Sequence, residues 1–259
     1  MQDSALITSD DNAMGISLMA HRGWASKYPE NTLAALSAAG ESGINFIEFD
    51  IQLTRDGVPV LLHDEDLTRT GATSQVVTSS DYVDLVGLEV NYPEKFSGHH
   101  HGHLLPTLAA ALILLDEHPE WIYFIELKRE SIDAFGTKAC VNQLLPLIYD
   151  YLPQCVVISF EYDCLQEVCR RSDVAIGWVL RQYNEDAYKK AIELDPDYLI
   201  INHSRLPSGS NAVWQGGWHW ASYEVTEPTT AKMLHLRGID IISSMDAPGL
   251  AKALLESGI

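Results

Sequence analysis

Residues 16–53 read ISLMAHRGWASKYPENTLAALSAAGESGINFIEFDIQL and contain one complete strand–helix–strand unit. The short apolar runs Ile16–Ala20 and Phe46–Leu53 predict strands that are buried on both faces, as in a parallel sheet. Between them, Thr32–Ser42 has a helical pattern, and Gly43 stands where the helix should end. Because parallel strands need a crossover connection, the stretch predicts a βαβ unit.

The same alternation of strand and helix patterns continues to the end of the chain. Val58–Leu62 is interpreted as a continuation of the second strand, and six further strands are expected at Ile122–Leu127, Val156–Phe160, Ala175–Leu180, Tyr198–Asn202, His219–Val225 and Ile239–Ser243. Helices are expected at Thr107–His118, Asp133–Tyr151, Cys164–Arg171, Glu185–Leu194, weakly near Asn211, at Glu227–Leu236 and at Gly249–Glu256. The residues placed for N-caps are Asn31, Thr107 and Thr226, and Gly238 stands at a helix end.

Eight strand–helix units over this length predict an α/β fold of the (β/α)8 TIM-barrel type. The competing architecture is a doubly wound open sheet, although no Gly-x-Gly-x-x-Gly opens the first helix. About forty residues after His63 break the rhythm, and they predict a small insertion at residues 65–106 within a single domain of residues 1–259. We expect this segment to cap the C-terminal mouth of the barrel. Its run His99-His100-His101-Gly102-His103 could bind a transition metal or form a solvated loop.

The composition restricts the class of partner. The 259 residues are 46% hydrophobic, enough for a substantial core, and the formal charge of −19 argues against nucleic acid or an anionic membrane surface. The sequence shows neither a membrane-spanning run nor a leader pattern, so we expect a cytoplasmic protein without a stable membrane anchor. An anionic small-molecule substrate would then need locally concentrated positive charge, which a metal ion and a few basic side chains could supply.

Two strand ends carry paired polar residues. Glu48 and Asp50 are two apart on an apolar strand and therefore project to the same side, as do Glu126 and Lys128 on the next predicted strand. Three carboxylates that converge would suit a hard divalent cation such as Mg²⁺ or Ca²⁺, with Mn²⁺ as a further option, and Lys128 would face a phosphate. The alternative is that these residues only form ion pairs at the strand ends.

Two histidines also follow strand patterns. His21 and Arg22 end the first strand, and His63 follows Val58–Leu62 and precedes Asp64. An imidazole can donate or remove a proton near neutral pH, and a guanidinium offers a planar fork for phosphate oxygens. TIM barrels assemble their sites from the C-terminal ends of several strands, and these residues fall there. The set suits metal-assisted phosphodiester chemistry with His21 and His63 as the acid–base pair.

The order of these motifs closely resembles the glycerophosphodiester phosphodiesterases. The matching stretches are Ala20-His21-Arg22-Gly23, Pro29-Glu30-Asn31-Thr32, Glu48-Phe49-Asp50-Ile51-Gln52-Leu53-Thr54, Asp56-Gly57-Val58-Pro59-Val60, His63-Asp64, Leu67-Thr68-Arg69-Thr70, Leu105-Pro106-Thr107-Leu108, Glu126-Leu127-Lys128 and Ser159-Phe160. The resemblance implies a TIM barrel with a small insertion, one divalent metal ion, and hydrolysis of glycerophosphodiesters to glycerol 3-phosphate and an alcohol. Carried over by position, it makes Glu48, Asp50 and Glu126 the metal ligands. It makes His21 and His63 the acid–base pair, with Arg22 and Lys128 on the phosphate.

The C-terminal third departs from the family pattern. Where the family usually has Trp-Thr-Val-Asn on the seventh strand, this chain reads Tyr223-Glu224-Val225-Thr226. Tyr223 would line the pocket and affect which alcohol fits, and Glu224 adds negative charge. Phe160 is expected to pack against the glycerol backbone or, alternatively, to be a core aromatic. A lysophospholipase D-like activity on lysophospholipids and a non-catalytic phosphate-binding barrel remain the other functional hypotheses.

Overall fold

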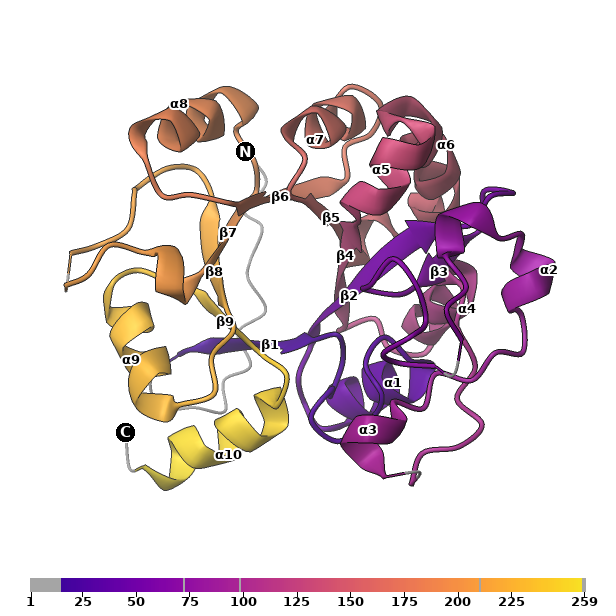
Figure 1. The fold of residues 1–259 in the computed structure, drawn as a ribbon. Helices are drawn as coiled ribbons and strands as arrows, with labels where there is room; N and C mark the ends of the chain where they lie inside the picture. Colours follow the sequence, from indigo (N-terminus) through magenta and orange to yellow (C-terminus); the bar gives the residue numbers. More distant parts are fainter. Residues whose placement is uncertain (1–14, 72, 98, 210, 258–259) are drawn as a thin grey trace.

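The computed structural model describes residues 15–257 except positions 72, 98 and 210. Eight parallel strands form a closed ring with helices around its outside (Figure 1). Around the ring they are β1 (Ser17–His21), β2 (Phe46–Leu53), β4 (Ile122–Leu127), β5 (Cys155–Ser159), β6 (Ala175–Leu180), β7 (Tyr198–Asn202), β8 (His219–Tyr223) and β9 (Ile241–Ser244). Because β1 pairs with both β2 and β9, the sheet has no open edge, and the predicted (β/α)8 barrel is confirmed.

The helices follow the predicted order with two corrections. They are α1 (Leu33–Glu41), α4 (Leu108–Ile113), α5 (Arg129–Phe135), α6 (Thr137–Ile148), α7 (Tyr162–Cys169), α8 (Glu185–Leu194), α9 (Pro228–Leu236) and α10 (Ala247–Glu256). The single helix expected at Asp133–Tyr151 is wrong, because Gly136 has a φ of 82° and separates α5 from α6. The weak helix near Asn211 is absent, since residues 206–209 and 211–218 are irregular. Among the described residues, no helix is long and apolar enough to cross a bilayer.

One of the three predicted N-caps is confirmed. The Thr107 side chain accepts a hydrogen bond from the Ala110 N–H at the start of α4. At α1 the N-cap is Thr32 instead of Asn31, and at α9 it is Glu227 instead of Thr226. The glycines predicted at helix ends, Gly43 and Gly238, follow the ends of α1 and α9 with positive φ.

A ninth strand, β3 (Pro59–Leu61), lies outside the ring. It pairs antiparallel with β2, so the interpretation of Val58–Leu62 as a continuation of the barrel strand is wrong. The chain reverses at Gly57, whose φ of 84° suits a tight turn. The reversal brings the chain back along β2. The Leu62 N–H donates a hydrogen bond to the Asp50 carbonyl, so the next residue, His63, lies close to Asp50.

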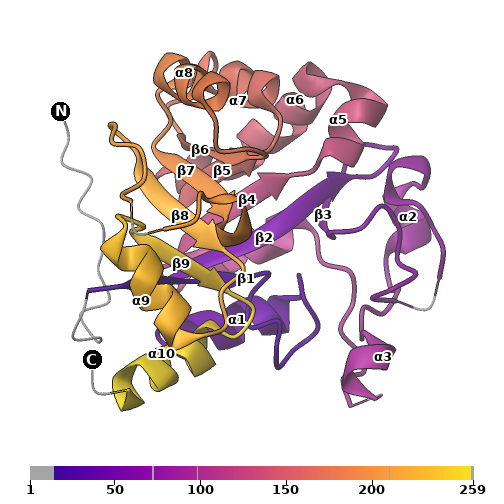
Figure 2. The same cartoon turned by 60° about the vertical axis from the view of Figure 1, so that its left-hand side comes forward.

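The insertion packs a small apolar cluster of its own against β3. It contains the short helices α2 (Tyr82–Leu85) and α3 (Pro93–Phe96) and lies beside β2, β3 and α1 in both views (Figures 1 and 2). The buried members of the cluster are Val60, Leu62, Leu67, Val77, Leu85, Val90 and Leu105. This contact attaches the insertion to one side of the barrel.

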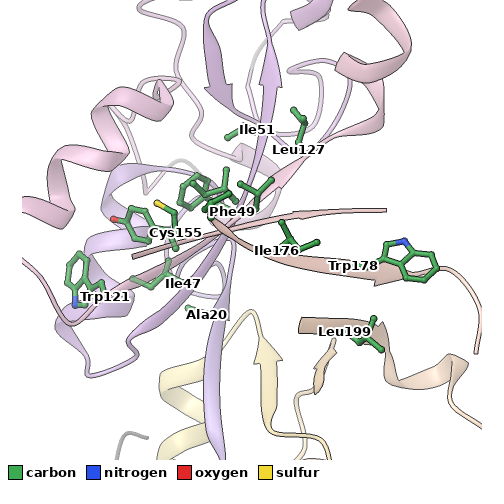
Figure 3. Packing of buried hydrophobic residues seen from close by; sticks show 14 of the residues in the cluster. Ala20, Ile47, Phe49, Ile51, Trp121, Leu127, Cys155, Ile176, Trp178 and Leu199 are labelled. Atoms are coloured by element: carbon green, nitrogen blue, oxygen red, sulfur yellow. The ribbon is translucent and has the colours of Figure 1, made fainter. Parts of the chain in front are cut away.

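Side chains on the barrel strands alternate between two cores. Ile47, Phe49 and Ile51 of β2 belong to the outer core between strands and helices, where Figure 3 shows them together. Phe46 belongs to the inner core and meets Phe124 of β4 edge to face at 5.9 Å. By the same alternation, Glu48 and Asp50 share the inward side of Phe46. Their carboxylates therefore point into the buried interior of the ring.

Candidate active site

Three carboxylates meet at the inner face of β2 and β4. Asp50 and Glu126 are register partners on the two strands, and Glu48 is one inward position before Asp50. One oxygen from each of the three carboxylates lies within 4.8 Å of the others, and all three residues are buried. The structure thus brings together the three residues that the sequence predicts as metal ligands.

Two cationic side chains lie beside the three carboxylates. The Lys128 Nζ lies 3.2 Å from Asp50 Oδ1 and 3.0 Å from Glu126 Oε1, and the Arg22 Nε lies 3.3 Å from Asp50 Oδ2. Burial opposes ionisation of Asp50, but Lys128 and Arg22 outweigh it and lower the pKa of this carboxyl. Burial and the neighbouring carboxylates raise the pKa of Glu126, and they raise that of Glu48 to about 8. The ionised forms of Glu48 and Glu126 are therefore disfavoured unless a further cation lies beside them.

The Glu48 carboxylate also has an unused oxygen. Its Oε2 accepts a hydrogen bond from the Arg22 backbone N–H at 2.9 Å. In the part of the chain that the structure describes, the buried Oε1 has no hydrogen-bond partner. A buried polar atom without a partner is costly unless a ligand supplies the missing interaction. A set of three carboxylates, one of which has an oxygen without a partner, fits a divalent cation.

His21 lies at the end of β1, opposite Glu48 in the strand register. Its Nε2 is 3.7 Å from Glu48 Oε2, and its Nδ1 is 3.3 Å from Glu224 Oε1. Burial lowers the pKa of His21, but the charges of Glu48 and Glu224 outweigh burial and raise it above its usual value. The imidazole is thus held between two carboxylates from β2 and from the segment after β8.

His63 is held by its neighbour Asp64, and Asp64 belongs to a charged network whose other members the sequence did not identify. Its Nδ1 is 2.6 Å from Asp64 Oδ1, and Asp64 Oδ2 accepts a hydrogen bond from the Arg69 Nε at 2.6 Å. Arg69 also donates two hydrogen bonds of 2.8 Å to Glu30, which accepts a third from Arg22 at 2.8 Å. Glu30 and Arg69 stand in motifs that match the family, but nothing in the sequence shows that they meet. The network connects His63 with the arginine next to His21.

Asn31, placed as an N-cap by sequence, instead holds Asp50. It has a φ of 57°, its Nδ2 donates to Asp50 Oδ2 at 3.0 Å, and its Oδ1 accepts from the Asp50 N–H at 3.1 Å. Asparagine tolerates this left-handed conformation better than most residues. The Asp50 carboxylate is therefore fixed in position by its amide neighbour as well as by its cations.

All the predicted site residues line one cavity of about 140 Å³. Its lining residues are Met19, His21, Arg22, Glu48, Asp50, His63, Glu126, Lys128, Ile158, Phe160, Val179, Ile200, Tyr223 and Ser243. The charged members come from β1 to β4 and the apolar ones mainly from β5 to β8. None of the lining residues comes from the described part of residues 65–106, and the role of this segment as a cap stays a prediction.

The histidine run of the insertion does not assemble a second cluster of this kind. Among the described residues, the only group of three potential metal ligands within 4.8 Å is the buried acidic one. His100 instead contacts the rings of Tyr28 and Phe96, and His101 lies 3.8 Å from a carboxylate oxygen of Glu89. The loop hypothesis is thus favoured over a three-ligand metal site.

Sequence comparison places the chain among known proteins. The model of the glycerophosphoryl diester phosphodiesterase family matches residues 21–242, which is most of the chain. The chain belongs to this family. A glycerophosphodiester phosphodiesterase from Caldanaerobacter subterraneus subsp. tengcongensis is 31% identical over 155 residues, covering 58% of this chain and 60% of that protein. Mouse glycerophosphodiester phosphodiesterase 1 is 31% identical over 153 residues, covering 59% of this chain and 44% of its own. The matched parts thus span about half the length of these curated relatives.

Solved structures of the phosphodiesterase family share the fold. An Oleispira antarctica phosphodiesterase, solved in complex with the product sn-glycerol-3-phosphate, superposes with a TM-score of 0.80 at 23% identity. The match covers 92% of this chain and 96% of that one. A glycerophosphodiester phosphodiesterase from Agrobacterium tumefaciens gives a TM-score of 0.70 at 22% identity, covering 92% and 99%. Both likenesses extend over nearly the whole barrel.

Proposed function

We propose that this chain hydrolyses glycerophosphodiesters to glycerol 3-phosphate and an alcohol, with one divalent metal ion and two histidines. The observation that carries the proposal is the single cavity at the barrel mouth. It combines three buried carboxylates, two basic side chains and two imidazoles. Family membership and the product bound to the Oleispira antarctica phosphodiesterase support the same substrate class.

Glu48, Asp50 and Glu126 would hold the metal ion. Mg²⁺, Ca²⁺ and Mn²⁺ all accept such oxygen ligands. When bound, the ion would offset the negative charge that builds up on the phosphate oxygens during hydrolysis. Lys128 and Arg22 already border the same carboxylates and would bind phosphate oxygens from the side of β4 and β1. The site would thus concentrate positive charge inside a strongly acidic protein.

The two histidines would handle the protons of the reaction. One imidazole removes a proton from the attacking water, and the other gives a proton to the alcohol oxygen as the phosphorus–oxygen bond breaks. Both rings line the cavity and each has a carboxylate at its Nδ1. Phe160 and Tyr223 line the cavity on the apolar side and would contact the glycerol or alcohol part of the substrate.

A substrate panel tests this proposal. Purified protein is incubated with Mg²⁺, Ca²⁺ or Mn²⁺ and with glycerophosphocholine, glycerophosphoethanolamine or lysophosphatidylcholine, and released glycerol 3-phosphate and lysophosphatidic acid are measured. We expect glycerol 3-phosphate from the water-soluble diesters and complete loss of activity with EDTA. Faster cleavage of lysophosphatidylcholine would favour the lysophospholipase D-like activity instead. Product binding without any turnover would support the non-catalytic barrel.

A further inference from the structure

Glu224 contacts the predicted catalytic residue His21 from the segment that follows β8. It follows β8, whereas His21 ends β1, and β9 lies between these strands in the ring. Its Oε1 lies 3.3 Å from His21 Nδ1. By the resemblance described under the sequence analysis, the family pattern would have a threonine at this place, where this chain has Glu224.

The surrounding backbone holds Glu224 in this position. The next residue, Val225, donates its N–H to the Ser243 carbonyl at 3.0 Å, which ties the segment to β9. The Glu224 side chain is 34% exposed, so it lies at the rim while His21, at 14%, lies deeper. The carboxylate thus reaches inward to the imidazole from a segment that is tied to β9.

This contact determines which nitrogen of His21 carries the proton. An ionised carboxylate can only accept a hydrogen bond, so Nδ1 must be the donor. In the neutral ring Nε2 then keeps its lone pair, and Nε2 is the nitrogen that faces Glu48 at 3.7 Å. Without Glu224 the proton can move to Nε2, or the ring can rotate. In either case the Nε2 lone pair no longer faces Glu48.

We propose that Glu224 is a positioning residue that fixes the Nδ1–H tautomer and the orientation of His21, so that Nε2 exchanges protons with the substrate. The inference rests on the proposed phosphodiesterase function. Glu224 acts through His21 and does not contact the reacting atoms. Carboxylates that orient an active imidazole in this way typically contribute about 10- to 100-fold to activity.

The test compares Glu224→Ala with Glu227→Ala, a matched control. Glu227 is an exposed carboxylate three residues away with no side-chain hydrogen bond at its helix N-terminus. With glycerophosphocholine and Mg²⁺, we expect kcat of Glu224→Ala to fall at least about 10-fold with KM within about twofold. Glu227→Ala should behave as wild type. Glu224→Ser serves as a second variant if the alanine protein does not fold, which thermal melting reports.

A spectroscopic measurement separates positioning from a general structural effect. Protein labelled with ¹⁵N-histidine and loaded with Mg²⁺ is examined by long-range ¹H–¹⁵N NMR, with the His21 signals assigned by their loss in His21→Gln. At a pH above the raised pKa of His21, where the ring is neutral, we expect the Nδ1–H tautomer in wild type and Glu227→Ala, and the Nε2–H form or a mixture in Glu224→Ala. An unchanged tautomer or an unchanged kcat in that variant overturns the inference. If wild type releases no glycerol 3-phosphate, the proposed function fails, and the NMR result still decides the positioning role.

Discussion

The two halves of the barrel mouth differ in character. Strands β1 to β4 supply the charged side of the cavity, including the acidic cluster and both histidines. Strands β5 to β8 supply an almost wholly apolar side, with Ile158, Phe160, Val179, Ile200 and Tyr223. A glycerophosphodiester is also divided, since its anionic phosphate joins a glycerol to an alcohol. On the proposed function, the charged side would perform the chemistry and the apolar side would contact the organic part of the substrate.

The largest expected effect is in the acidic cluster of the charged side. Asp50→Asn removes the charge that pairs with Lys128 and Arg22 and one of the proposed metal ligands. We expect kcat/KM for glycerophosphocholine to fall on the order of 10³-fold or more at saturating Mg²⁺. Asp81→Asn, which alters a partly exposed carboxylate paired with Arg55 outside the cavity, is the control and should retain full activity. Near-normal activity of Asp50→Asn would mean that the charged side does not hold the metal.

The histidines should give the next largest effect. His21→Ala and His63→Ala are each expected to reduce kcat by about 10²- to 10⁴-fold, because a positioned acid or base contributes that much. Thermal melting should change little, since both rings lie at strand ends beside the cavity. The control is His101→Ala in the insertion, where the side chain is 70% exposed. Normal turnover by either active-site variant would remove that histidine from the mechanism.

A smaller effect on activity is expected from Arg69, the residue of the insertion that contacts the charged side of the cavity. Arg69→Met removes the two hydrogen bonds that Arg69 donates to Glu30 and the one that it donates to Asp64. The Glu30 side chain is only 3% exposed. We expect the free energy of unfolding to fall by about 2 kcal/mol, as for lost hydrogen bonds to buried charges. Because Asp64 then holds His63 less firmly, kcat should also fall about 10-fold. Denaturant unfolding and steady-state kinetics measure the two effects, and loss of neither would show that the network is incidental.

The pH dependence of stability also tests whether Arg69 stabilises Glu30 and Asp64. Burial opposes ionisation of Glu30 and Asp64, but hydrogen bonds from Arg69 outweigh it and lower both pKa values. Carboxyls with a lowered folded-state pKa stabilise the protein above their unfolded pKa of about 4, and this stability is lost as the pH falls through the lower folded pKa. Below about pH 5, wild type should therefore lose stability more steeply than Arg69→Met. Parallel unfolding curves for the two proteins would contradict this account.

The smallest effect is expected on the apolar side. Phe160 lines the cavity, and the Arg181 guanidinium lies 4.8 Å from its ring centre. Phe160→Ala should raise KM about fivefold with kcat nearly unchanged, because about 1 kcal/mol of apolar contact is lost equally in substrate and transition state. Phe135→Ala, in the outer core, should lower stability instead. A large fall in kcat for Phe160→Ala would end the division of roles between the two sides.

The sequence predicts the parts of the site that depend on strand periodicity. Glu48 with Asp50, and Glu126 with Lys128, stand two apart on apolar runs, so alternation alone places each pair on one face. The common end of parallel strands then brings the pairs together. The barrel follows from the same runs and from their spacing by helices.

What the sequence could not predict depends on contacts between distant segments. Glu224 reaches His21 past β9, and Arg69 reaches Glu30 from the insertion, and no local pattern encodes either distance. The antiparallel direction of β3 depends on the turn at Gly57, which the apolar run alone does not reveal. Asn31 likewise looks like a helix cap until its contact with Asp50 is seen. Pairings of this kind are set by tertiary packing.

The most direct test of the central claim is a calorimetric titration of the metal-stripped protein with Mg²⁺ or Mn²⁺. The account predicts one bound ion per chain in wild type and in Asp81→Asn, and loss of that binding in both Asp50→Asn and Glu126→Gln. Undiminished binding of the ion by Asp50→Asn and Glu126→Gln would contradict it, because the cation would then lie somewhere other than among Glu48, Asp50 and Glu126.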